Sequence, residues 1–244
     1  IRDSPRAGRQ YVDGDKGARS GEVVRKRCSG YQGALQTDGY ERYEWLDASK
    51  GIMLLACWAH ARRKFSDAIK NDKERAESAL DQIQLLYEVE RQIKDQSLTF
   101  EQAAKLRERL AYPIMVRFEK WLVAEHAKVI KGSPIEKAIL YTYNRFNKLS
   151  RYHLDGRYNI DNNGIENAAR PVAVGRKNYL FCQNDDTAES TAIIYSLMGC
   201  CKAAGVDFRK WLIYFLDHVH GYDENYDKDI ADLLPDNLRK AELL

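Results

Sequence analysis

The chain has 244 residues, of which 44% are hydrophobic and 31% are charged, and this length suffices for one large domain or two small ones with a real core. The 39 Lys and Arg residues nearly balance the 36 Asp and Glu residues, giving a net charge of +3, which excludes a polybasic, histone-like protein. No apolar run approaches the roughly 20 residues that span a bilayer. We therefore expect a soluble, cytoplasmic protein without a membrane partner.

The first 60 residues are predicted to form strands and one short helix. Turn residues separate β-type runs at 10–12, 33–37 and 52–56. The segment 20–26 begins with a sequence similar to a capping box, which indicates a short helix. Strands that alternate with a helix predict a mixed α/β domain.

The chain from His60 to about Tyr152 is predicted to be helical. Apolar residues recur there at helical spacing within highly charged sequence. Pro113 interrupts the pattern, and so does the stretch 131–134, which contains Gly132 and Pro134. We therefore expect three or four helices and little sheet.

A last helical block is predicted from about 188 to 216. Gly205 interrupts it, and Asp207 is suited to cap the final helix. The tail at 221–244 is acidic, and we expect it to be loosely held.

Asp38 ends an apolar run and is followed by Gly39. A side chain at the end of a strand projects beyond the edge of the sheet, where a metal or substrate can reach it. Gly39 would let the backbone turn away at once. An Asp-Gly pair is also a common turn sequence, so a turn and a ligand-binding role are both open.

A second candidate segment begins at Asp161 and Asn162, either of which can cap a helix. The next turns would place Asn163, Glu166 and Arg170 on one face, because residues three and four apart are neighbours on a helix. A carboxylate one turn from an arginine is also a common surface ion pair. Both a surface and a catalytic role are therefore open for Glu166.

Two short segments are rich in positive charge. One follows the second candidate segment, contains an aromatic residue and lacks acids; the other lies just after residue 60. Such composition suits contact with a phosphate backbone, although a solvated helix start explains the second segment equally well. The basic residues are Arg176 and Lys177 in the first segment, and Arg62, Arg63 and Lys64 in the second.

Cys57 and His60 form a Cys-x-x-His sequence, which is half of a zinc site. No second pair occurs at ligand spacing, because Cys200 and Cys201 are adjacent. Cys57 and His60 could instead pack as core residues.

In combination, these motifs resemble the bacterial transposases of the insertion sequence 66 family. The resemblance covers almost the whole chain in matching order, at 35–40, 56–65, 161–171, 175–181 and 193–206.

The resemblance implies the ribonuclease-H-like fold of the DDE superfamily, with a mixed sheet and a large all-helical insertion. It assigns residues 1–190 to the catalytic domain, with the insertion at about 66–155. A C-terminal helical element would follow at 191–220, before the acidic tail.

The resemblance also implies chemistry with two Mg²⁺ or Mn²⁺ ions, which bind carboxylate oxygens and promote phosphoryl transfer. Asp38 matches the family's second acid and Glu166 its third, while the first acid is expected ahead of Ile1. Cys57, His60 and Asn163 would support the site. The residues expected to contact DNA are Arg62, Arg63, Lys64, Arg170, Arg176 and Lys177.

The function implied is cleavage and strand transfer of DNA at the ends of a mobile element. Its partners would be element and target DNA, further copies of the chain and the element's accessory proteins. Two alternatives are open: a truncated remnant that folds and binds DNA or a partner without chemistry, and a metal-dependent nuclease that cleaves without joining.

Overall fold

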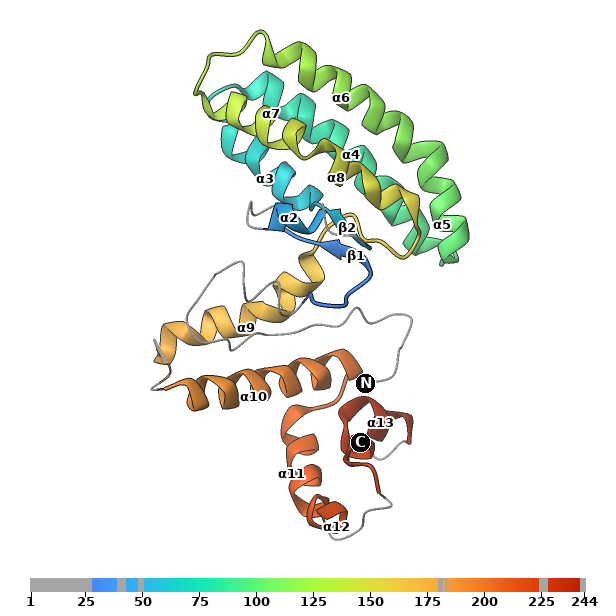
Figure 1. The fold of residues 1–244 in the computed structure, drawn as a ribbon, viewed down its shortest axis with the longest axis vertical. Coiled ribbons are helices and arrows are strands. Elements are labelled where there is room, and N and C mark those ends of the chain that lie inside the picture. Colours follow the sequence, from blue (N-terminus) through green and yellow to red (C-terminus); the bar gives the residue numbers. More distant parts are fainter. Residues whose placement is uncertain are drawn as a thin grey trace. The chain divides into compact units, whose positions relative to one another are not determined.

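The computed structural model describes residues 28–38, 43–47, 51–179, 182, 184–223 and 228–241, most of them in helices (Figure 1). The chain divides into a first unit, residues 19–164, and a second unit, residues 1–18 and 165–244.

The first unit contains β1 (Gly33–Gln36), α2 (Glu44–Asp47), β2 (Ile52–Leu55), α3 (Trp58–Ala68), α4 (Lys73–Asp95), α5 (Phe100–Leu106), a π turn (Arg107–Ala111), α6 (Tyr112–His126), α7 (Pro134–Asn144), α8 (Phe146–Ser150) and a 3₁₀ turn (Arg151–Leu154). Helix α9 (Asn163–Tyr179) begins at the end of the first unit and continues in the second. The other elements of the second unit are α10 (Asp185–Ala204), α11 (Phe208–His218), α12 (His220–Asp223), a 3₁₀ turn (Ile230–Leu233) and α13 (Pro235–Lys240).

Strands β1 and β2 form a parallel pair, with Gly33 opposite Ile52 and Gln36 opposite Leu55. They confirm the strands predicted at 33–37 and 52–56. The strand predicted at 10–12 and the helix predicted at 20–26 lie outside the described residues.

The expectation of a ribonuclease-H-like mixed sheet is wrong. A mixed sheet needs antiparallel as well as parallel neighbours, whereas the described residues contribute two short parallel strands. Strand β2 ends at Leu55, and α3 begins three residues further on, at Trp58. Most of the described chain after β2 follows helical periodicity. The apolar residues of this part are therefore buried mainly between helices.

Helices α3, α4, α6 and α7 pack around the core of the first unit (Figure 1). Trp58 and Phe65 of α3 each lie 6.1 Å, between ring centroids, from Phe118 of α6. The indole N–H of Trp58 donates to the carbonyl of Leu149 at 2.9 Å, so this buried polar group is satisfied. The burial of Phe118 on α6 agrees with the helical spacing predicted for the region from His60 to Tyr152.

The segment from residue 58 to 154 contains six α-helices rather than the three or four expected. The side chains of Asp72, Thr99 and Ser133 each accept a backbone N–H three residues further on, and these bonds start α4, α5 and α7. The π turn Arg107–Ala111 separates α5 from α6, and Arg145 separates α7 from α8. Local caps and one π turn therefore divide the helical sequence more finely than its prolines do.

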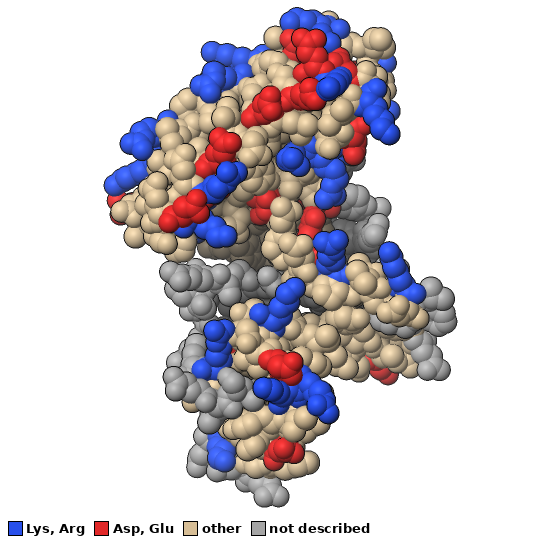
Figure 2. Space-filling model, turned by 180° about the vertical axis from the view of Figure 1, so that it is seen from behind, with Lys and Arg blue, Asp and Glu red and all other residues tan. Residues whose placement is uncertain are grey.

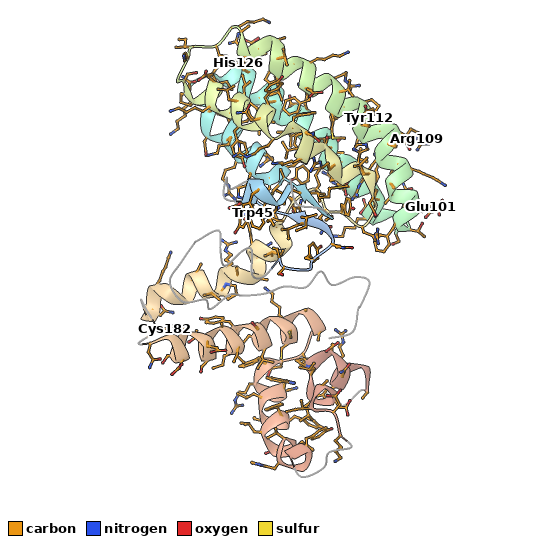
Figure 3. The ribbon with its side chains drawn as sticks, in the orientation of Figure 1. Trp45, Glu101, Arg109, Tyr112, His126 and Cys182 are labelled. Atoms are coloured by element: carbon orange, nitrogen blue, oxygen red, sulfur yellow. The ribbon has the colours of Figure 1, made fainter. Side chains whose placement is uncertain are left out.

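Arg107 holds the π turn in place from a nearly fully buried position. Its guanidinium donates to both carboxylate oxygens of Glu90, at 2.8 and 2.6 Å. It also donates to the carbonyls of Tyr152 and Asp155, at 3.0 and 2.9 Å. The buried charge is thus paired and well hydrogen-bonded, which offsets the cost of removing it from water. Tyr112, at the start of α6 in Figure 3, marks where the π turn ends.

The second unit has a small core in which Cys201, Trp211 and Leu238 are buried. Gly205 ends α10 with a φ of 70°, a conformation that glycine adopts without strain. The carboxylate of Asp207 accepts the backbone N–H of Lys210 and caps α11. Both local predictions for this block are confirmed.

The expectation of a loose tail is wrong for residues 228–241. Leu233 is 1% exposed and Leu238 is 3% exposed, and the carbonyl of Leu233 accepts the indole N–H of Trp211 at 2.8 Å. The domain boundaries implied by the resemblance stay a prediction. Within the described ranges, no helix combines the length and apolar character needed to cross a bilayer.

Candidate functional site

Three segments that carry the sequence motifs meet in the first unit. They are the end of β1, the start of α3 and residues 159–163, which we call the approach segment because they lead into α9. The side-chain amide of Gln36 donates to the carbonyl of Asn159 at 2.9 Å, and the backbone N–H of Trp58 donates to the carbonyl of Ile160 at 3.1 Å. Hydrogen bonds therefore hold the approach segment against both other segments.

Asp38 is exposed two residues beyond the end of β1. The hydroxyl of Tyr141, in α7, donates to the backbone carbonyl of Asp38 at 2.9 Å. Burial raises the pKa of Tyr141, Arg145 opposes this rise, and the charges of Cys57 and Asp38 add to it. The carboxylate of Asp38 therefore lies within electrostatic range of the tyrosine that fixes its backbone.

Cys57 is 1% exposed at the position just before α3. Burial raises the pKa of its thiol, while hydrogen bonds from the backbone N–H groups of Asn162, His60 and Ala59 lower it in part. Since Cys57 is almost fully buried, it is a packed core residue of this junction. His60 is half-buried in the first turn of α3.

Asp161 links the approach segment to helix α4. Its carboxylate accepts the hydroxyl of Tyr87 at 2.9 Å, and also the backbone N–H and side-chain amide of Asn163, at 3.1 and 2.9 Å. Burial raises the pKa of Tyr87, and the Asp161 charge raises it further, while Arg62 opposes the rise. Asp161 thus caps the start of α9, as predicted, and Tyr87 anchors the cap.

Helix α9 (Asn163–Tyr179) carries the other acid. Glu166 lies in its first turn and is partly buried, whereas Arg170 and Lys177 are exposed. Arg170 follows Glu166 by four residues and Lys177 follows Arg170 by seven, so the three share one face of the helix. The side chain of Arg176 lies outside the described residues. Asp38 belongs to the first unit and Glu166 to the second.

The three basic residues Arg62, Arg63 and Lys64 are exposed on α3. On the face shown in Figure 2, Lys and Arg side chains are interspersed with Asp and Glu rather than gathered into one uniformly basic surface. Contacts with an anionic polymer would therefore depend on individual clusters.

Comparison with known proteins assigns the family. The sequence model of the transposase IS66 family matches residues 13–190. The chain belongs to this family. It is 31% identical to the uncharacterized protein y4hP of Sinorhizobium fredii over 88% of the chain and 41% of that protein. It is 32% identical to the uncharacterized protein y4qI of the same bacterium over 88% of the chain and 40% of that protein.

The chain therefore spans about two fifths of the length of these relatives. No solved structure matches it. The region matched by the IS66 family model includes all three segments that meet around Cys57, as well as Tyr87 and Tyr141.

Membership of a DDE transposase family implies the use of divalent metal ions in general. Asp38 and Glu166 fit this requirement by the chemistry of their side chains, because hard cations prefer carboxylate oxygens. Neither side chain is fully buried, so both are within reach of an ion. Among the described residues, no three His, Cys, Asp or Glu side chains gather as a metal-binding group.

Sequence reasoning missed the two tyrosines that bind the motif segments. Tyr87 has the helical spacing of a core residue, and its hydroxyl partner lies 74 positions away. Tyr141 precedes Arg145 by four residues, a spacing at which the two side chains meet on a helix. That spacing was the one signal in the sequence for a role of Tyr141 beyond packing.

Proposed function

We propose that this chain is part of a DNA transposase that cleaves strands at the ends of a mobile element and joins them to target DNA. The observation that carries the proposal is the IS66 family match over residues 13–190. The junction of the three motif segments supports it, because these segments hold Asp38 and lead directly to Glu166.

Asp38 and Glu166 are proposed as metal ligands. When bound by such carboxylates, Mg²⁺ or Mn²⁺ ions activate the attacking oxygen and stabilise the leaving 3′ oxygen of a phosphodiester. Hence no serine or cysteine nucleophile is required. The protein's task is to present carboxylate oxygens and to hold the DNA strand in line.

The exposed basic residues are proposed to bind the phosphate backbone. Charges of this kind position a strand without reading its sequence. The proposed contacts are Arg62, Arg63, Lys64, Arg170, Arg176 and Lys177.

Cys57, His60 and Asn163 are proposed as supporting residues rather than ligands. Cys57 is buried just before α3, and Asn163 is bonded to Asp161. Together with Tyr87, they would stabilise the start of α9. We further propose cytoplasmic action on DNA, with other copies of the chain and accessory proteins of the element as partners.

The test uses this chain together with any residues encoded upstream of Ile1, and DNA that carries the element ends. We expect cleavage and joining with Mg²⁺ or Mn²⁺ and none with a chelator. Asp38→Asn and Glu166→Gln should each abolish both products while DNA binding persists. The matched controls are Asp67→Asn and Glu189→Gln, which alter exposed acids on α3 and α10 and should retain activity.

The products decide between the alternatives. Activity that persists in Asp38→Asn or Glu166→Gln would remove the metal-ligand assignment. Cleaved but unjoined DNA would indicate a nuclease, and binding without cleavage under every condition would indicate a remnant.

A further inference from the structure

The backbone around Asp38 is held by hydrogen bonds on both sides of its Cα atom. Strand pairing ends at Gln36, which lies opposite Leu55. One residue further on, the backbone N–H of Thr37 donates to the carbonyl of Leu55 at 3.0 Å. The carbonyl of Asp38 then accepts the hydroxyl of Tyr141 at 2.9 Å. Because the Cα atom of Asp38 lies between these two bonds, the point from which its side chain extends is fixed.

The bond from Tyr141 comes from a distant part of the sequence within the same unit. Tyr141 belongs to α7 and lies 103 positions after Asp38. Asp38 is exposed and lies two positions beyond the last paired residue of β1, where an exposed strand end frays readily. A hydrogen bond from a packed helix restricts this fraying. The Tyr141 hydroxyl is therefore the second of two anchors for the backbone at Asp38.

The ring of Tyr141 is itself held in place. It packs against the large core of the first unit. The guanidinium carbon of Arg145 lies 4.2 Å from the centre of the ring, and the ammonium nitrogen of Lys64, on α3, lies 5.5 Å from it. A cation over the face of a ring is attracted to it, so both contacts favour the observed position of the ring. The hydroxyl thus reaches Asp38 from a side chain with little freedom to move.

A fixed backbone matters for a residue that binds a metal ion. A carboxylate on a mobile segment loses conformational freedom when it binds an ion, and this loss weakens binding. Groups that orient a metal ligand reduce that loss in advance, and substituting them typically lowers metal affinity about 10–100-fold. Since the Tyr141 hydroxyl bonds the backbone of Asp38 rather than its carboxylate, we expect an effect at the lower end of this range.

We propose that Tyr141 is a positioning residue for Asp38, whose hydroxyl bond holds the Asp38 carboxylate where it can bind Mg²⁺ or Mn²⁺. The inference rests on the proposed function, in which Asp38 is a metal ligand. It goes beyond that function because it gives the helical region between the two proposed ligands a part in forming the metal site.

The test begins with Tyr141→Phe, which removes the hydroxyl and keeps the ring. The matched control is Tyr143→Phe, which removes an exposed hydroxyl from the same helix. Each variant is made in this chain together with any residues encoded upstream of Ile1. Circular dichroism, together with wild-type hydrogen exchange in α3 and α7, establishes that Tyr141→Phe is folded.

Two measurements without DNA report on the positioning role. The Mn²⁺ concentration at half-saturation, followed by the loss of the electron paramagnetic resonance signal of the free ion, should rise about tenfold in Tyr141→Phe. It should stay unchanged in Tyr143→Phe, and Asp38→Asn should weaken Mn²⁺ binding at least as much as Tyr141→Phe does. Without metal, the backbone amide of Thr37 should exchange faster in Tyr141→Phe than in the wild type.

Cleavage of element-end DNA separates positioning from general damage. Saturating Mn²⁺ should restore cleavage by Tyr141→Phe to the wild-type rate, because the ligand itself is intact. It should not restore cleavage by Asp38→Asn. A rate for Tyr141→Phe that stays low at every Mn²⁺ concentration, in a protein that cleaves as the wild type, would contradict the positioning role.

Two results of the binding experiment would overturn the inference. One is an equal Mn²⁺ half-saturation for Tyr141→Phe and Tyr143→Phe, whether or not exchange at Thr37 rises. The other is Mn²⁺ binding by Asp38→Asn equal to that of the wild type, since Asp38 would then not be a ligand. Failure of the proposed function has a different signature: Mn²⁺ binding still depends on Asp38 and Tyr141, while no DNA is cleaved.

Discussion

The two units of this protein are each built around a buried tryptophan, but the surroundings of the two indoles differ. Trp58 and Trp211 both donate their indole N–H to a distant backbone carbonyl, at 2.9 and 2.8 Å. Trp58 lies in an extensive core that draws on β2, α3, α4, α6 and α7. Among the described residues, Trp211 clusters with the buried residues Cys201 and Leu238.

The second unit leaves apolar side chains exposed beside its small core. Helix α10 in the second unit has apolar residues on the stripe that carries Cys201, yet Ile193 and Ile194 on that stripe are 55% and 51% exposed. A small core with exposed apolar neighbours stabilises a unit less than a large one does, because less apolar area is removed from water. We therefore expect the second unit to unfold first.

The largest effect is expected for Trp58→Ala. Removing a buried aromatic from a core that cannot collapse costs about 3–5 kcal/mol of unfolding free energy, and here the Leu149 carbonyl also loses its donor. Urea titration followed by circular dichroism measures the loss. Hydrogen exchange should rise in α3, α4 and α6 and stay unchanged in α11.

Val123→Ala is the control for this variant, since Val123 on α6 is 54% exposed. It should cost no more than about 0.5 kcal/mol. Equal losses for the two variants would contradict the view that the first unit depends on one packed core.

A smaller loss, about 3 kcal/mol, is expected for Trp211→Ala, because its few neighbours can close part of the cavity. Relative to the stability of the second unit, this loss is nevertheless large. Hydrogen exchange should rise in α11, α13 and the end of α10, with α3 and α4 protected as in the wild type. The control is Leu216→Ala, at a 57% exposed position of α11. If Trp211→Ala instead raised hydrogen exchange throughout the chain, the two units would unfold together, contrary to this expectation.

Local chemistry explains which parts of the fold were predictable. Both described strands, the caps at Asp161 and Asp207, and the break at Gly205 depend on residues within one turn of each other. The prediction of a mixed sheet failed because strand propensity shows only that a segment can be extended. It does not show with how many other strands that segment will pair. The tail was misjudged because its acidic composition hid Leu233 and Leu238, which are both buried.

The candidate site was predictable in its motifs and not in its connections. Asp38, Cys57 and Asp161 stood out as short sequence patterns, and all three lie in segments that meet or are joined by hydrogen bonds. Tyr87 and Tyr141 did not stand out, because a tyrosine at a core spacing looks like packing until its hydroxyl partner is known. Such pairings over long sequence separations depend on the tertiary fold.

The smallest effect is expected for Tyr87→Phe, which tests where the first unit ends. This substitution removes the hydroxyl that bonds the Asp161 carboxylate at 2.9 Å, and a hydrogen bond to a charged group contributes about 1.5 kcal/mol. Asp161 keeps its two bonds to Asn163, so α9 should still form. Its first turn should nevertheless exchange amide hydrogens faster than in the wild type.

The control is Tyr143→Phe, which alters a tyrosine that is 46% exposed on α7 and should change neither stability nor exchange. If Tyr87→Phe speeds exchange at the start of α9 and leaves α11 unchanged, the cap belongs energetically to the first unit. The stability of the large helical core would then extend through Tyr87 and Asp161 to the helix that carries Glu166. Unchanged exchange at the start of α9 would mean that the bonds between Asp161 and Asn163 maintain the cap without help from the Tyr87 hydroxyl.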